Sequence, residues 1–202
     1  MSSSFETRTS TELLHALKER GNETAWSVFD ARFHPILLTV VQKMGVSRED
    51  AADVAQTAMA EFFRDYQAGK YDRGKARLRT WLISIAKNRA IDLLRKKQAR
   101  RGARGDSVLV NVADDETAGR AWAEEEERAI AREALETLRT QTRVSEQNIR
   151  IFELVDIQGV SPERAATECG VTVDHVYKAT NRCRRHMKQI VQDLRRRYDG
   201  EE

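Results

Sequence analysis

The sequence predicts an all-α protein built from two small helical domains that are joined by an acidic flexible linker. Apolar residues recur at spacings of three and four along most of the chain, which is the periodicity of amphipathic helices. No segment shows a convincing strand-like alternation or hairpin signal. The composition agrees, since only 2 of the 202 residues are proline and strong helix formers are abundant.

The first predicted domain, residues 1–101, opens with a short helix over 11–20 and a longer apolar stripe from Trp26 to Met44. Pro35 lies inside this stripe, so a kink or two consecutive helices are expected. The aromatic and aliphatic side chains of these segments are candidates for the core of the domain.

Two further helices complete this domain. Ser47 is a plausible N-cap for a helix over 48–66. Residues 67–77 include two glycines and form the expected loop. A strong helical pattern then runs over 78–97.

Residues 102–123 form the predicted linker, because glycine and acidic residues replace the apolar periodicity there. The second predicted domain, residues 124–202, contains helical segments over 124–140, 146–157, 162–169 and 173 to about 197. Two helical modules are therefore expected on either side of a flexible connection.

Charge is distributed unevenly along the chain, although the net charge is only +3. Residues 70–104 hold thirteen Lys or Arg against two acids, and residues 178–197 hold eight against one. Residues 106–128, by contrast, hold eight acids and two bases. Two cationic elements on one chain predict two contacts with the same polyanion, and the pattern favours nucleic acid.

The second basic element follows the pattern of a helix-turn-helix. Ser161 and Pro162 begin one helix, and Gly170 permits the left-handed turn that leads into the next. An ordinary helical hairpin with a solvated basic face is the alternative. The residues of the second helix that are predicted to contact DNA are Thr172, Asp174, His175, Tyr177, Lys178, Asn181, Arg182 and Arg185.

Two stretches of the first domain carry a family resemblance. Residues 50–56 read DAADVAQ, and residues 81–95 read WLISIAKNRAIDLLR. Both resemble region 2 of bacterial RNA polymerase sigma factors of the extracytoplasmic-function type, and the helix-turn-helix resembles region 4 of that family. The resemblance implies a transcription initiation factor that binds core RNA polymerase at its beta-prime clamp and beta flap, directs it to promoter DNA and assists melting of the −10 element.

The same resemblance implies roles for individual residues. Region 4 would bind the −35 element, and the loop before the tryptophan helix would capture a flipped −10 base. Trp81 itself lies on the apolar stripe, so a core position competes with a DNA contact there. The residues implied in −10 DNA binding are Arg73, Lys75, Arg77, Arg79, Trp81, Lys87, Asn88, Arg89, Asp92 and Arg95.

The helix over 48–66 would contact the polymerase, yet it departs from the family pattern. Ala52 and Thr57 stand where the family usually has glutamate. Phosphorylation of Thr57 by a Ser/Thr kinase would restore negative charge there, while a neutral surface threonine and control by an anti-sigma factor or by expression level are the alternatives. The implied polymerase contacts are Asp50, Asp53, Gln56 and Thr57.

Other functions find less support in the sequence. No nucleophile elbow or phosphate-binding loop is present, so we expect neither an enzyme nor a cofactor. No metal is expected either, since Cys169, His175, Cys183 and His186 are spaced too widely to converge on one zinc ion. The lack of a long apolar run and of a signal peptide predicts a cytoplasmic protein without membrane contact. The alternative function is a helix-turn-helix transcriptional regulator that acts without core polymerase.

Overall fold

The computed structural model describes residues 10–19, 21–72, 74–100 and 113–199. Every regular element among these residues is helical, which confirms the predicted fold class. The chain divides into two compact units, one within residues 1–127 and the other within 128–199. None of the described helices combines the length and the apolar character that crossing a bilayer requires.

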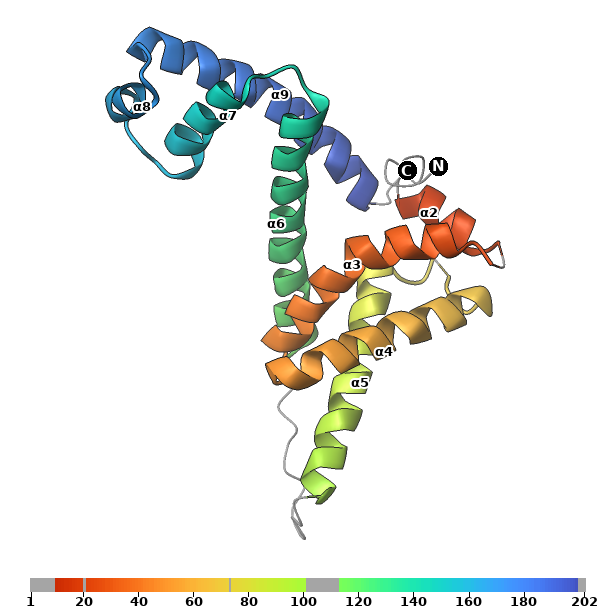
Figure 1. The fold of residues 1–202 in the computed structure, drawn as a ribbon. Coiled ribbons are helices and arrows are strands. Elements are labelled where there is room, and N and C mark those ends of the chain that lie inside the picture. Colours follow the sequence, from red (N-terminus) through yellow and green to blue (C-terminus); the bar gives the residue numbers. More distant parts are fainter. Residues whose placement is uncertain (1–9, 20, 73, 101–112, 200–202) are drawn as a thin grey trace. The chain divides into compact units, whose positions relative to one another are not determined.

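The first unit is built on three long helices that contact one another pairwise (Figure 1). These helices are α3 (Glu23–Lys43), α4 (Arg48–Gln67) and α5 (Leu78–Arg100), and the short helix α2 (Ser10–Leu17) packs on α3. Aromatic rings fill the centre. Phe29 of α3 stacks on Phe62 of α4 with ring centroids 4.9 Å apart, and Phe33 lies 4.7 Å from Phe29. Such ring pairs stabilise the core beyond the area that they bury.

α3 is one continuous helix, so two consecutive helices do not form at Pro35. Pro35 is exposed, and its carbonyl accepts a hydrogen bond of 3.2 Å from the Thr39 hydroxyl. Phe33 and Leu37, on either side of the proline, are both buried. Packing of this apolar face keeps the helix intact across the missing backbone donor.

The structure differs from the predicted linker over residues 115–123, which are helical and begin α6 (Asp115–Gln141). Residues 102–112 of that linker lie outside the described residues. The Asp114 carboxylate accepts a 2.7 Å hydrogen bond from the Thr117 N–H and so starts the helix. Trp122 is buried against the first unit, which therefore extends to residue 127 instead of ending at 101. Acidic neighbours obscure this apolar signal in the sequence.

The second unit is a smaller helical cluster (Figure 1). It contains the rest of α6, α7 (Glu146–Phe152), the π-helical turn η1 (Glu153–Ile157), α8 (Pro162–Cys169) and α9 (Val173–Asp199). The single helix expected over 146–157 therefore changes to π-helical geometry at Glu153. Val176 of α9 is fully buried in a core with Ile151, Leu154 and Ala165, so α7, α8 and α9 form one packed body.

Candidate nucleic-acid interface

An aromatic cluster lies where the loop before α5 meets α4. The Tyr71 ring stacks on the Trp81 ring, with centroids 4.9 Å apart and planes 18° apart. Phe62 meets the same indole edge-on at 5.1 Å, and Tyr66 lies 5.9 Å from Tyr71. Trp81 and Tyr71 are only partly buried. Trp81 therefore belongs to the edge of the core and keeps part of its surface accessible.

Asp72 shapes the loop between α4 and α5. Its carboxylate accepts a 2.9 Å hydrogen bond from the Gly74 N–H, and its carbonyl accepts one of 3.0 Å from the Lys75 N–H. These bonds satisfy backbone donors in an exposed turn. Lys75 keeps 83% of its side chain exposed, although its Nζ lies 3.4 Å from Asp72. Arg73, another predicted DNA contact, lies outside the described residues.

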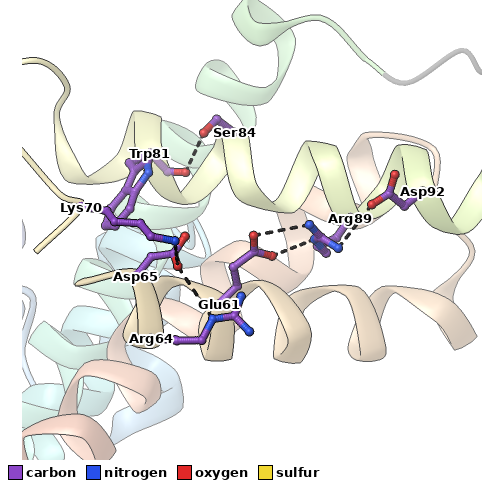
Figure 2. Close-up of polar contacts among 8 residues, drawn as sticks. All are labelled: Glu61, Arg64, Asp65, Lys70, Trp81, Ser84, Arg89 and Asp92. Carbon is purple, nitrogen blue, oxygen red and sulfur yellow. Dashed lines mark hydrogen bonds and ion pairs between the residues drawn. The ribbon is translucent and has the colours of Figure 1, made fainter. Parts of the chain in front are cut away.

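Arg89 of α5 is held between two carboxylates, as Figure 2 shows. Its Nε lies 2.7 Å from the Glu61 carboxylate of α4, and its Nη1 lies 3.3 Å from Asp92. Two predicted DNA contacts, Arg89 and Asp92, therefore pair with each other. Glu61, which sequence reasoning missed, fixes them to α4.

Lys87 of α5 is also engaged, since its Nζ lies 2.6 Å from the Asp115 carboxylate at the start of α6. Only part of the predicted −10 set is thus presented openly to solvent. Its exposed members are Lys75, Arg77, Arg79, Asn88 and Arg95.

Asp50, at the start of α4, forms an intramolecular ion pair with Lys97. The Nζ of Lys97 lies 2.5 Å from its carboxylate, and the Ser47 hydroxyl donates to the same oxygen. These hydrogen bonds, that of Lys97 first, hold the pKa of Asp50 below its usual value. The other predicted polymerase contacts, Asp53, Gln56 and Thr57, lie exposed along α4.

The predicted helix-turn-helix is present in α8 and α9. The Ser161 hydroxyl accepts a hydrogen bond from the Arg164 N–H at 3.3 Å and caps α8. Gly170 takes a left-handed conformation with φ 64°, which turns the chain toward α9. The Thr172 hydroxyl then accepts the His175 N–H at 3.2 Å and caps α9.

The outward face of α9 is basic. A shallow depression of 610 Å³ on this face is lined by Lys178, Asn181, Arg182, Arg185 and His186. Lys178 lies 2.6 Å from Asp174 one turn earlier, and Tyr177 is 52% exposed. Four of the eight residues predicted to contact DNA here therefore share one accessible surface.

Two polar contacts join α9 to neighbouring elements. Their partners, Asn148 and Asp156, were not identified from the sequence. The Nε2 of His175 lies 3.0 Å from the Asn148 Oδ1 of α7, so His175 is less available to DNA than predicted. The Arg184 guanidinium donates to the Asp156 carboxylate of η1 at 2.6 Å and 3.1 Å. Asp156 raises the pKa of Arg184 through these hydrogen bonds.

The cysteines belong to the packing of the second unit. Cys183 is buried, its thiol donates to the Asn148 carbonyl at 3.6 Å, and burial raises its pKa to about 11. Cys169 packs against the core of the helix-turn-helix. Within the described ranges, no group of three or more His, Cys, Asp or Glu is arranged to hold a metal ion.

Residues 30–100, which include most of α3 and all of α4 and α5, match the family model described as Sigma-70 region 2. Over these residues the chain is therefore similar to region 2 of the sigma-70 family. The exposed side of α4 and the basic side of α5 both lie within the matched segment.

The chain is 32% identical, over 84 residues, to the ECF RNA polymerase sigma factor RpoE of Cereibacter sphaeroides. The alignment covers 42% of this chain and 45% of RpoE, so the chain matches less than half the length of that relative. A solved structure of CnrH in complex with the cytosolic domain of CnrY is similar over 90% of this chain and 96% of that chain. The sequence identity there is 20% and the TM-score is 0.37.

Proposed function

We propose that this chain is a transcription initiation factor of the extracytoplasmic-function type. It binds core RNA polymerase, directs it to specific promoters and assists opening of the −10 element. The match of residues 30–100 to sigma-70 region 2 carries this proposal. On that segment α4 presents exposed polar side chains and α5 presents exposed cations, which suit two chemically different partners.

The basic side of the first unit is the proposed −10 surface. Its exposed cations would neutralise backbone phosphates and release counterions, so binding should weaken steeply with salt. Tyr71 belongs to the loop that precedes α5, and its partly buried ring stacks on the partly buried ring of Trp81. Stacking of an unpaired base on an aromatic ring is worth ~1–3 kcal/mol, which is enough to favour an opened strand.

The helix-turn-helix of the second unit is the proposed −35 surface. The N-terminal part of α9 would enter the major groove, as recognition helices do. Lys178, Asn181, Arg182 and Arg185 share the accessible face of this helix. His175 and Arg184 would support the geometry of α9 from its two flanks, because each bonds to a neighbouring element.

The exposed side of α4 is the proposed polymerase surface, and its exposed acids are Glu49 and Asp53. Asp53 is exposed there, whereas Asp50 is engaged by Lys97. Thr57 lies exposed one helical turn from Asp53. A phosphate on Thr57 would add about −1.5 to −2 charges to this surface, so phosphorylation by a Ser/Thr kinase is a proposed route to activation.

Transcription with purified components tests the function. Adding the chain to core polymerase should produce transcripts from a subset of fragments of genomic DNA that core polymerase alone does not transcribe. The chain should also co-purify with core polymerase. If it binds promoter fragments without polymerase and never associates with it, the helix-turn-helix regulator is the correct assignment.

Three variants test the role of Thr57. Thr57→Glu should bind core polymerase more tightly than Thr57→Ala, by ~1.5–3 kcal/mol if one charge-assisted contact is gained. Ala60→Glu is the matched control, because it adds the same charge at an exposed position of the same helix. Equal affinity of Thr57→Glu and Thr57→Ala, measured by titration of labelled polymerase, would reject the phosphorylation hypothesis.

A further inference from the structure

The first half of α6, residues 115–127, is a helix docked on the first unit. Ala118 and Trp122 are 1% exposed, and Ala121 is 3% exposed. Their spacing of three and four residues places them on one side of the helix. The Trp122 ring stacks beside Phe33 of α3, with centroids 6.2 Å apart. Burial of this indole is the main apolar contribution to docking.

Two ion pairs accompany the apolar contact, one near each end of the segment. The Nζ of Lys43 lies 2.6 Å from the Glu124 carboxylate, and the Nζ of Lys87 lies 2.6 Å from the Asp115 carboxylate. Asp114 adds negative charge beside Asp115. Its pKa is lowered, mainly by hydrogen bonds from Thr117 and to a smaller extent by the charges of Arg120 and Lys87. The start of α6 is therefore an anionic group held against the basic helix α5.

This segment occupies part of the basic surface of α5. A cavity of 280 Å³ is lined by Arg79, Thr80, Ile83, Ser84, Asp115 and Gly119. Lys87 and Arg79 both belong to the predicted −10 set. Asp115 thus occupies the position beside Lys87 in which a backbone phosphate would neutralise the Lys87 charge.

We propose that the start of α6 acts as an internal substitute for DNA. Asp115 engages Lys87 in the free chain, and a backbone phosphate replaces Asp115 when DNA binds. This inference rests on the proposed function, because it takes α5 as a DNA contact. The exchange is feasible because the Asp115 side chain is 83% exposed, and exposed ion pairs contribute little to stability. Buried Trp122 keeps the rest of the segment docked.

The test measures binding of a labelled single-stranded DNA oligonucleotide to the full chain at low salt. Asp115→Asn should bind about two- to five-fold more tightly than the unmodified chain, which is the size expected for one exposed ion pair. The gain should vanish when Lys87 is changed to Gln, because the double-mutant cycle isolates the contact between these two residues. Circular dichroism verifies that each variant keeps its helical content.

Glu116→Gln is the matched control, since it removes the same charge from the neighbouring exposed position. An equal gain from Glu116→Gln, or a gain from Asp115→Asn that persists with Lys87→Gln, would overturn the proposal in favour of a net-charge effect. Failure of Asp115→Asn to bind the oligonucleotide more tightly would also overturn it. Failure of the proposed function is seen separately, as the absence of promoter-dependent transcription with core polymerase.

Discussion

At the scale of single residues, Tyr66 shows how one side chain joins distant parts of the first unit. Its hydroxyl donates a 2.6 Å hydrogen bond to the Leu14 carbonyl, which lies 52 residues earlier in the chain. Its ring stacks 5.8 Å from Phe62. Burial raises the pKa of Tyr66 to about 12, because the phenolate would lose hydration.

Replacing Tyr66 with Phe should lower the free energy of unfolding by about 1–3 kcal/mol, because the buried Leu14 carbonyl loses its donor. Urea unfolding followed by circular dichroism measures this change. Tyr177→Phe is the control, since the Tyr177 side chain is 52% exposed. A similar loss of stability in both variants would contradict the assigned role of the hydroxyl.

Tyr66 also predicts a dependence of stability on alkaline pH. The pKa is about 12 in the folded chain and about 10 in an unfolded one, so the folded state binds the proton more tightly. The contribution of the protonated Tyr66 hydroxyl to the free energy of unfolding is fully present below about pH 10. It is lost as the pH rises toward 12. Unfolding measured across this range should show a smaller decrease for Tyr66→Phe, and identical pH profiles would refute the linkage.

At the scale of elements, the turn between α8 and α9 depends on a backbone conformation that glycine favours. Gly170 has φ 64°, and an added Cβ there would meet no atom within 4 Å. Gly119 lies inside α6 and has equally open surroundings, but its φ is not positive. The two glycines therefore differ in backbone strain and not in available space.

The same substitution should have opposite effects at these two positions. Gly170→Ala should destabilise the second unit by ~1–2 kcal/mol, because an L side chain is strained in the left-handed region. Gly119→Ala should stabilise α6 by roughly 0.5–1 kcal/mol, because alanine loses less entropy in a helix. Thermal unfolding by circular dichroism distinguishes the two, and a change of the same sign in both variants would contradict this reading.

Several elements could be predicted from the sequence because their signals are local. Apolar spacing indicated α3, α4 and α5, while Ser161, Pro162 and Gly170 marked the helix-turn-helix. The start of α6 was missed because its apolar stripe consists of two alanines and Trp122 among acids. The π-helical geometry of η1 has no local signature either, and its Asp156 is bound by Arg184, a partner 28 residues away.

The basic residues of the candidate site could be predicted from the sequence, but their ion-pair partners could not. The basic character of α5 is plain in the sequence, yet the ion pairs of Lys87 with Asp115 and Arg89 with Glu61 each join residues 28 positions apart. Only the folded chain brings these groups together. Which cations stay exposed is therefore a property of packing and not of residue type.

At the scale of the whole molecule, two separate cores support the two proposed DNA contacts. The first core contains Trp122, and the second contains Leu138, so α6 supplies side chains to both. The proposed −10 and −35 surfaces belong to different units, each with its own packed interior. Substitutions in one core should therefore affect one DNA contact more than the other.

The position of Trp122 in the first core has a spectroscopic consequence. The chain has three tryptophans, Trp26, Trp81 and Trp122, and all of them precede residue 128, where the second unit begins. Indole emission therefore follows the first unit alone, whereas far-ultraviolet ellipticity follows the helices of both. The unmodified chain thus carries a built-in optical reporter that separates the melting of one unit from that of the other.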